Sequence, residues 1–331
     1  MAGRRQKKSG GRSYAWRYRG RIVACVFVEV IIICALVIMI GWNKGVKEWF
    51  EQFEQPVLKE VDISGINSPN AILMQARGGK ILGEINGEAQ IYPASMTKIM
   101  TVILGIENFD DLDEKITLTD EMFAGLYEQD ATQAGFQPGE EVRVIDLLYG
   151  AMLPSGAECC IALADTISGS EADFAELMNK KARKLGMENT HFCDSTGLHN
   201  PDHYSTVKDI AVLMKYCIKN DTFREIVETS RHSTGVTNIH PDGITYYSTM
   251  FKNLSDPTVT GGKILGGKTG YTSEAGHCLV SFAEIEGREY IFVSAGASGA
   301  EGNTIPHIQD AVTVYNRVGA AIEAKMNNNN K

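Results

Sequence analysis

Cysteine is scarce in this chain, with seven among 331 residues and no pair at the CxxC spacing. Cys25 and Cys34 lie in an apolar run near the N-terminus, which leaves five, an odd number, in the rest of the chain. Disulfide frameworks use even numbers of cysteines, and many structural zinc sites use closely spaced pairs. The sequence therefore argues against a disulfide-dense scaffold and favours buried free thiols, with a single bridge left open.

The chain also lacks the compositional bias of disordered or collagen-like proteins. Apolar residues make up 44% of the sequence and charged residues 22%, which is the balance of an ordinary globular protein. No internal repeat is found. A chain of this length can bury one large hydrophobic core or two modest ones.

Acidic residues are absent from residues 1–21, a segment that carries eight lysines and arginines. This basic tail contributes +8 to a net charge of −9, so residues 22–331 carry −17. Residues 22–41 explain the contrast, because they are mostly apolar with one charge, Glu29, and are long enough to cross about 30 Å of hydrocarbon. Since basic flanks stay in the cytoplasm, the sequence predicts a single-pass protein of the cell membrane whose body is extracellular.

No signal-peptidase site follows this span. Gly41 leads into Trp42, Asn43 and Lys44 rather than into small residues of the A-x-A kind, so we expect an uncleaved transmembrane signal anchor. Residues 42–69 come next and are predicted to form a juxtamembrane stalk, because aromatic residues recur there at near-helical spacing among Lys, Glu and Gln.

The remaining chain mixes strand and helix patterns and predicts an α/β (α+β) domain over residues 70–325. Strand patterns bounded by turn signals are found at 71–76, 81–85, 115–118, 231–234, 264–269, 277–283 and 290–295. Helical apolar spacing is found at 144–153, 157–167, 171–185, 207–219, 223–229 and 305–325. Because three of these helices are consecutive, they predict an all-helical subdomain inserted into the strand-containing one. Residues 326–331 are predicted to be a disordered tail.

The stretch from Pro93 to Lys98, PASMTK, contains a serine and a lysine three residues apart where a helix is expected to begin. This spacing places the Ser95 hydroxyl and the Lys98 amine on one face, a single turn apart. The pair suits a nucleophile and its base if burial and neighbouring positive charge lower the pKa of the lysine. SxxK also arises by chance, with an ordinary N-cap serine and a solvated lysine, so further motifs are needed.

Two such motifs follow in order. Ser155-Gly156 ends a helix 60 residues after Ser95, and Lys268-Thr269-Gly270 lies in a strand-to-turn stretch 113 residues further on. The first part of an acyl transfer can then be divided among three side chains. Ser95 attacks a carbonyl, Lys98 takes its proton, and Ser155 relays a proton to the leaving amine.

The third motif serves the substrate. Lys268 and Thr269 are predicted to hold an anionic group, and Gly270 allows the strand backbone to approach closely. The backbone amides of Ser95 and Tyr271 are candidates for an oxyanion hole. A local cation at Lys268 is needed to hold an anion against the negative charge of the body.

The stretches PASMTK, LLYGAMLPSG, TGLHNPDHYST and GGKTGYTSEAGHCLV together resemble the serine D-alanyl-D-alanine carboxypeptidases, the low-molecular-mass penicillin-binding proteins. The resemblance runs from about Ala71 to Ala297. It implies a serine β-lactamase/transpeptidase-like fold, with an antiparallel sheet flanked by helices. It also implies removal of the terminal D-Ala from peptidoglycan stem peptides through an acyl-enzyme on Ser95, with β-lactams as covalent inhibitors. No metal, cofactor or nucleic acid is expected.

The sequence departs from this family in its middle motif, which is usually Ser, any residue, Asn, whereas the third position here is Ala157. A carboxamide would bridge the lysine and the serine and hold the substrate, but a methyl group makes no hydrogen bond. Rate, substrate choice or activity itself is therefore open, and so is a D,D-endopeptidase activity. Glu158 is interpreted as a helix N-terminal charge. Little chain follows the domain, so the N-terminal span is expected to supply the tether.

Parts of the sequence suggest three alternative functions. A zinc peptidase would draw on one loop, residues 190–206, but the candidate ligands fit neither a Cys-pair nor an HExxH spacing: His191, Cys193, His199, Asp202 and His203. A class A β-lactamase would need a glutamate-held water, for which no glutamate stands in a recognisable loop. A family member that binds muropeptides without turnover is motivated by the alanine of the middle motif, whereas the intact serines and lysines favour activity.

Overall fold

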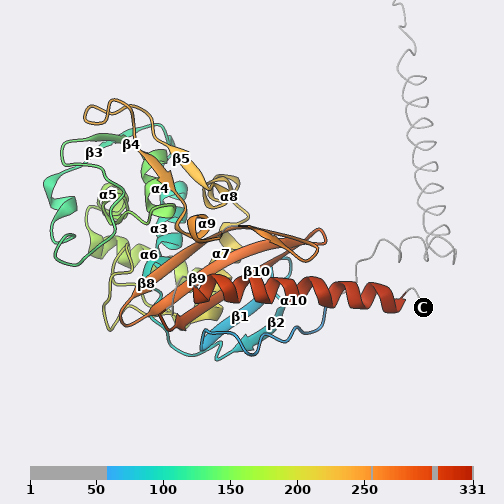
Figure 1. Cartoon of the computed structure of the whole chain (residues 1–331). Coiled ribbons are helices and arrows are strands. Elements are labelled where there is room, and N and C mark those ends of the chain that lie inside the picture. The colour runs from blue at the N-terminus through green and yellow to red at the C-terminus, as the bar shows by residue number, and fades with distance from the viewer. Residues whose placement is uncertain (1–57, 255, 300–304, 330–331) are drawn as a thin grey trace, which may run out of the picture. The chain divides into compact units, whose positions relative to one another are not determined.

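An antiparallel sheet of six strands forms the base of the part of the chain that the computed structural model describes, residues 58–254, 256–299 and 305–329 (Figure 1). Its strand order is β2-β1-β10-β9-β8-β7, and each neighbouring pair is antiparallel. The strands are β1 (Asn70–Gln75), β2 (Ile81–Ile85), β7 (Thr258–Val259), β8 (Gly262–Thr272), β9 (Gly276–Ile285) and β10 (Arg288–Ala297). Five of these strands were predicted, and β8 to β10 are longer than expected.

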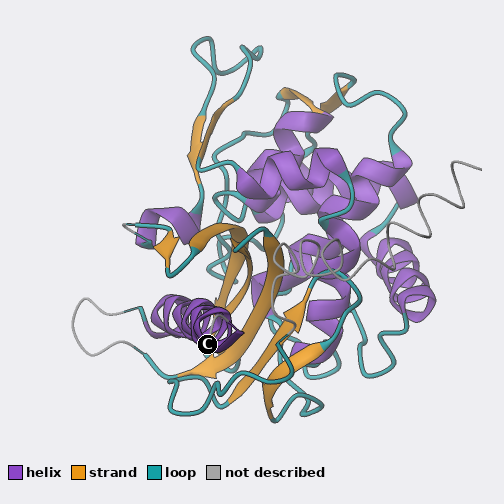
Figure 2. Ribbon diagram, turned by 90° about the vertical axis from the view of Figure 1, so that its right-hand side faces the viewer, coloured by secondary structure: helices purple, strands orange, loops and turns teal. Residues whose placement is uncertain are grey.

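Both faces of this sheet are buried, as alternation along β1 shows. Ile72 and Met74 belong to one hydrophobic cluster, while Ala71 and Leu73 belong to the other. Side chains two residues apart share a face of a strand, so one sheet serves two separate cores. Helix α7 (Val207–Cys217) contacts one side, and α10 (Pro306–Asn329) lies along the opposite side, as Figure 2 shows.

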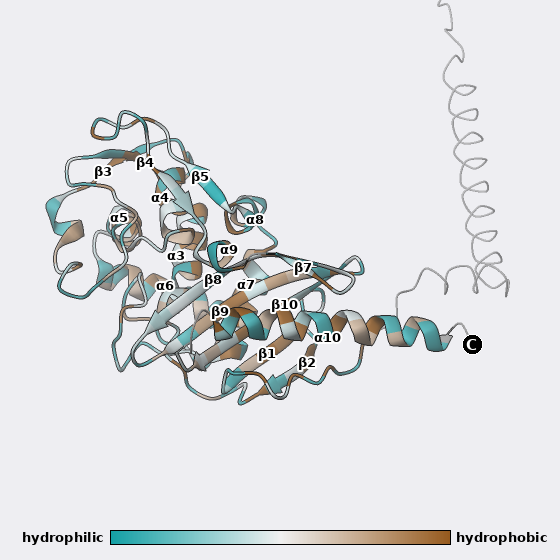
Figure 3. Ribbon diagram, in the orientation of Figure 1, coloured by the Kyte–Doolittle hydropathy of each residue, from teal (hydrophilic) through white to brown (hydrophobic). Residues whose placement is uncertain are grey.

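Helix α10 is amphipathic and presents its apolar stripe to the sheet. The stripe includes the buried residues Ala311, Val314, Val318 and Ile322, spaced by three or four positions, with Tyr315 buried beside Val314. Figure 3 shows the resulting alternation of apolar and polar bands along the helix. The Tyr315 hydroxyl accepts from the Phe292 amide over 3.1 Å, which anchors the helix to β10.

The two ends of the folded domain differ from prediction. Residues 58–69, assigned to the stalk, belong to the folded body, because Leu58, Val61 and Ile63 are buried in the α10-side core. The Val61 amide also donates to the Leu82 carbonyl over 2.8 Å, which ties this segment to β2. At the other end, α10 continues through Asn329, so residues 326–329 are helical rather than disordered.

The subdomain on the α7 side is mainly helical rather than all-helical (Figures 1 and 2). Its helices and the short helices near it are η1 (Ala94–Thr97), α3 (Lys98–Asn108), η2 (Asp120–Phe123), α4 (Val144–Met152), α5 (Ala157–Ser168), α6 (Glu171–Leu185), α8 (Asp221–Glu228) and α9 (Thr249–Asn253). Two ribbons accompany them: β3 (Lys115–Thr117) with β4 (Glu141–Arg143), and β5 (Arg231–Ser233) with β6 (Thr245–Tyr247). The predicted strand at 231–234 thus pairs locally and does not join the main sheet.

Helix α3 is the centre of this subdomain. Its residues from Lys98 to Gly105 are all buried, which is typical of a helix surrounded on every side. It contacts α4 and α5, and the η1 turn before it contacts β8 of the sheet. The N-terminal end of α3 therefore lies where the helices meet the sheet.

Within the described ranges, no helix combines the length and the apolarity that crossing a membrane requires. The predicted span, residues 22–41, and the basic tail before it lie outside those ranges.

Candidate active site

Ser95 and Lys98 stand at the junction of η1 and α3. Ser95 lies within the 3-10 turn, and Lys98 is the first residue of the α-helix, so the expected helix starts with a tighter turn. In a 3-10 turn, side chains three residues apart eclipse one another. Lys98 Nζ accordingly donates to Ser95 Oγ over 2.9 Å.

Ser155 reaches the same oxygen from the turn between α4 and α5. Its hydroxyl donates to Ser95 Oγ over 3.0 Å. Its φ of +74° is in the left-handed region, which costs a non-glycine residue about 1–3 kcal/mol. The Gly156 amide donates to the Gly150 carbonyl over 2.8 Å and closes this turn. Three residues predicted from sequence are thus joined in one hydrogen-bonded group.

The amine of Lys98 is enclosed, because the residue is only 4% exposed. Burial lowers its pKa from the usual 10.5, while the nearby Cys160, Asp194 and Glu158 act in the opposite direction. Besides Ser95, Nζ donates to the Thr196 carbonyl over 2.7 Å. Once neutral, the amine can accept the Ser95 proton over the same short distance and so serve as a base.

Lys268 and Thr269 lie on β8, the strand that contacts η1. Lys268 is 1% exposed, and burial together with the charge of Lys98 holds its pKa well below 10.5. Its amine donates to the Thr269 carbonyl over 3.1 Å, and the Thr269 hydroxyl lies 2.7 Å from that of Thr249 on α9. The two lysines thus share one buried region.

Gly270 and Tyr271 continue β8 past the nucleophile. A side chain at position 270 would place its Cβ 3.0 Å from the Ser95 nitrogen and 3.1 Å from the Ala94 Cβ. These distances are shorter than ordinary van der Waals contacts, so any other residue at position 270 would push the strand or η1 back by a few tenths of an ångström. Tyr271 follows with its side chain 60% exposed and its ring 4.7 Å from that of His277.

A small cavity of about 60 Å³ opens at Ser95 and Lys98. The other residues that line it come from four separate segments: Asp130, Ala131, Thr132, Ala157, Thr196, Gly197, Leu198, Tyr271 and Thr272. The stretch 130–132 carries no sequence motif, and only the fold brings it here. The stretch 196–198 lies in the loop 190–206, the same loop that supplied the candidate zinc ligands.

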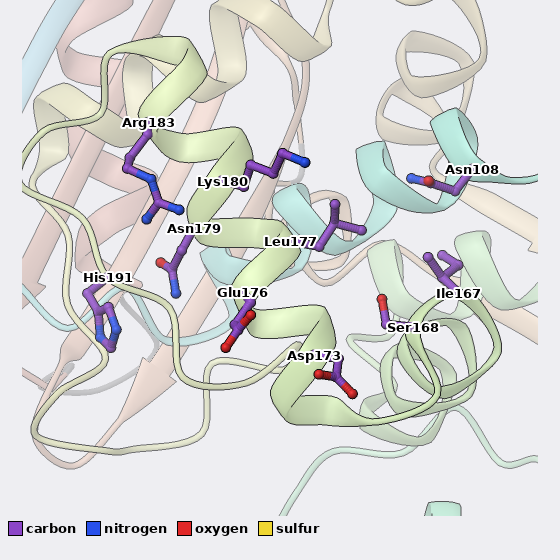
Figure 4. A pocket seen from close by; sticks show the side chains of 10 residues that line it. All are labelled: Asn108, Ile167, Ser168, Asp173, Glu176, Leu177, Asn179, Lys180, Arg183 and His191. Atoms are coloured by element: carbon purple, nitrogen blue, oxygen red, sulfur yellow. The ribbon is translucent and has the colours of Figure 1, made fainter.

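A larger hollow of about 820 Å³ lies along α6, as Figure 4 shows, and shares no lining residue with this cavity. Its walls include Asp173, Glu176 and Lys180 of α6 together with His191. In the described part of the chain, no serine or cysteine of this hollow is hydrogen-bonded to a base. The chemistry of nucleophile and base therefore belongs to the smaller cavity.

Ala157 and Glu158 begin α5 beside the cavity. Ala157 is buried, and its amide donates to the Thr132 carbonyl over 2.8 Å. Glu158 lies in the first helical turn, as interpreted, and Oε1 accepts from the amides of Ala134 (2.6 Å) and Gly135 (2.9 Å). Burial raises the pKa of Glu158 although these amides oppose the shift. This carboxylate therefore ties the loop that supplies Thr132 to α5.

The residues considered for zinc do not assemble into a metal site. Cys193 Sγ lies 3.6 Å from His191 Nδ1, but across the described ranges no three His, Cys, Asp or Glu side chains are arranged to hold a metal ion. His203 points instead toward Thr97, with Nε2 2.9 Å from the Thr97 hydroxyl.

Comparisons with known proteins identify the family of this chain. The family model Peptidase_S11, described as D-alanyl-D-alanine carboxypeptidase, matches residues 57–299. D-alanyl-D-alanine carboxypeptidase DacF of Bacillus subtilis is 35% identical over 231 residues, which cover 69% of this chain and 57% of that protein. DacC of Escherichia coli is 33% identical over 262 residues, covering 72% and 58%. The chain therefore spans somewhat more than half the length of these relatives.

A solved structure extends the similarity to the fold. The crystal structure of the Streptomyces K15 DD-transpeptidase superposes with a TM-score of 0.69 at 29% identity, and the match covers 79% of this chain and 100% of that one. The mixed α/β architecture with an antiparallel sheet is therefore that of the DD-peptidases, as the sequence motifs predicted.

Proposed function

Because this chain belongs to the D-alanyl-D-alanine carboxypeptidase family Peptidase_S11, we propose that it removes the terminal D-Ala from peptidoglycan stem peptides. The observation that carries the proposal is the hydrogen-bonded group of Ser95, Lys98 and Ser155. A serine that is hydrogen-bonded to a buried lysine amine can carry out acyl transfer without a metal or cofactor.

In the first half of the proposed reaction, Ser95 Oγ bonds to the carbonyl carbon of the penultimate D-Ala while neutral Lys98 takes the hydroxyl proton. The amides of Ser95 and Tyr271 stabilise the negative charge on the carbonyl oxygen. Ser155 then passes a proton to the leaving nitrogen, and Lys98 replaces it. The carbon–nitrogen bond breaks, D-Ala departs, and the acyl group stays on Ser95.

In the second half, a water molecule attacks the acyl-enzyme and gives its proton to Lys98, which returns it to Ser95 Oγ as the ester breaks. Lys268 and Thr269 bind the terminal carboxylate of the substrate during the first half. The arriving carboxylate would favour the charged form of Lys268, which burial disfavours in the free protein. A local cation suits this task because the chain outside the basic tail carries −17. A β-lactam would acylate Ser95 in the same way and leave slowly.

A second candidate is a protein that binds muropeptides without turnover, and the methyl group of Ala157 in the cavity is the observation that favours it. Mass spectrometry after incubation with penicillin separates the two. We expect an adduct on Ser95 and turnover of diacetyl-Lys-D-Ala-D-Ala that a Ser95→Ala variant lacks. An adduct without turnover would support the binding protein, and no adduct would refute acyl transfer. Rapid lactam hydrolysis would indicate a β-lactamase.

We also propose that residues 22–41 anchor the protein in the cell membrane with its catalytic domain outside. The support is the apolar length of this segment and the basic residues before it. External protease added to intact spheroplasts should digest the domain and spare residues 1–21, and protection of the domain would contradict the proposal.

A further inference from the structure

The second hydrogen-bond partner of Lys98 is a backbone carbonyl in the loop 190–206. Lys98 Nζ donates to the Thr196 oxygen over 2.7 Å, a shorter contact than its 2.9 Å bond to Ser95. Because Lys98 is 4% exposed, water has little access to the amine. The position of the Thr196 carbonyl therefore determines the direction in which the amine points.

Asp194 holds the turn that presents this carbonyl. Its Oδ1 accepts three hydrogen bonds of 2.7 Å, from the Thr196 amide, the Thr196 hydroxyl and the Gly197 amide. Gly197 has φ +80°, and a Cβ there would lie 1.9 Å from the Ala94 carbonyl oxygen. The backbone of this turn therefore packs directly against η1. An aspartate at the start of such a turn organises the backbone two and three residues on.

His203 connects the other oxygen of Asp194 to the residue before Lys98. Its Nδ1 lies 3.2 Å from Asp194 Oδ2, and its Nε2 lies 2.9 Å from the Thr97 hydroxyl. The Cys193 amide also donates to Nδ1 over 3.2 Å, which requires that nitrogen to be unprotonated, but the neighbouring carboxylate favours a proton there because an ionised acceptor makes the stronger hydrogen bond. Burial disfavours that ionised form, yet His203, Thr196 and Gly197 outweigh it and lower the pKa of Asp194 to about 2.

These contacts form a closed circuit from Lys98 through Thr196, Asp194, His203 and Thr97 back to Lys98. We propose that Asp194 and His203 are positioning residues that hold the Lys98 amine against Ser95 in a site whose middle motif ends in alanine. The inference rests on the proposed acyl transfer, because positioning a base matters only if the base is used. A misplacement of the amine by about 1 Å would slow acylation about 100-fold.

The test compares Asp194→Asn and His203→Gln with the control Asp202→Asn in the full-length protein. Asp202 lies in the same loop, is exposed, and makes no side-chain hydrogen bond among the described residues. The readout is the acylation of Ser95 by a fluorescent penicillin, resolved into the dissociation constant and the first-order acylation rate. We expect the rate to fall about 10- to 100-fold in the two variants with little change in the dissociation constant. The control should stay within about twofold of wild type.

A rescue experiment separates positioning from a general structural role. Ala157 and Lys98 line the same cavity of about 60 Å³, so a longer side chain at position 157 would extend into the space beside the amine. Adding Ala157→Asn to Asp194→Asn would give the amine a new carboxamide partner. We expect Ala157→Asn to raise the acylation rate of the Asp194→Asn variant. The factor of this increase should be about ten times larger than the factor by which Ala157→Asn changes the rate of the wild type. A merely destabilised loop would not be restored in this way.

Each outcome is decisive. Asp194→Asn and His203→Gln proteins that melt like wild type and acylate at the wild-type rate would overturn the positioning role while the proposed function stands. Failure of the wild type itself to acylate would refute the proposed function. If Asp194→Asn does not fold, Thr97→Val can be measured instead, because it removes the hydroxyl that hydrogen-bonds His203 at the other end of the circuit. A wild-type rate in that variant would likewise refute the inference.

Discussion

At the scale of single residues, the site depends on a lysine whose charged form is disfavoured by burial. Burial lowers the pKa of Lys98 below 10.5, and in the proposed reaction the neutral amine accepts the Ser95 proton. We therefore predict that the acylation rate with penicillin rises with pH and reaches half of its plateau below pH 10.5. Stopped-flow acylation across this range measures the midpoint. A midpoint at or above 10.5 would show that burial does not activate this lysine.

Ser155 combines a hydroxyl that we propose to be catalytic with a strained backbone, since its φ is +74°. Ser155→Ala and Ser155→Gly both remove the hydrogen bond to Ser95, so we predict that each lowers peptide turnover at least about 100-fold. Only glycine relieves the left-handed backbone, so Ser155→Gly should unfold with a free energy about 1 kcal/mol higher than Ser155→Ala. Urea denaturation measures the difference. Equal stability would mean that this turn carries no strain.

At the scale of elements, one carboxylate joins α5 to the loop that supplies the cavity wall. Glu158 is fully buried and accepts from two backbone amides of that loop. Glu158→Ala leaves both amides without an acceptor, so we predict a loss of about 2–4 kcal/mol in the free energy of unfolding. Hydrogen exchange should also increase at Ala134 and Gly135.

The matched control is Asp165→Ala, which removes a carboxylate from the same helix. Asp165 makes no side-chain hydrogen bond within the described residues, so its loss should cost less than about 0.5 kcal/mol. Equal costs for the two variants would show that Glu158 does not hold the loop.

At the scale of the whole molecule, α10 covers one face of the sheet and places a buried histidine at its start. His307 is 4% exposed, and burial together with the charge of His277 lowers its pKa to about 4, although Asp310 acts in the opposite direction. Between pH 4 and pH 6.5, His307 is therefore protonated in the unfolded chain, where its pKa is 6.5, but neutral in the folded protein. Stability is therefore lost as the pH falls from 6.5 toward 4.

For this histidine we predict a loss of up to about 3 kcal/mol in the free energy of unfolding between neutral pH and pH 4. His307→Phe keeps a ring in the same place without the titrating group, and should flatten this part of the pH profile. Chemical denaturation at a series of pH values measures both proteins. Parallel profiles would mean that His307 does not contribute to acid sensitivity.

Much of the fold follows from local patterns, because periodicity depends on neighbours along the chain. The strands and helices predicted between residues 71 and 325 are present, and α6 begins and ends at the predicted residues, Glu171 and Leu185. Pairing partners and packing are not local. The strand at 231–234 therefore joined a separate ribbon, and residues 58–69 joined the core although they had been included in the predicted stalk.

The sequence by itself determined the pairing of Ser95 and Lys98, because a spacing of three residues in one helical turn brings a hydroxyl and an amine together wherever the turn lies. Only the tertiary structure decided what surrounds them. Ser155 and Thr196 reach the pair from 60 and 98 residues away, and Asp194 and His203 act through the loop between. Such contacts depend on how helices and sheet pack, and no local pattern encodes that packing.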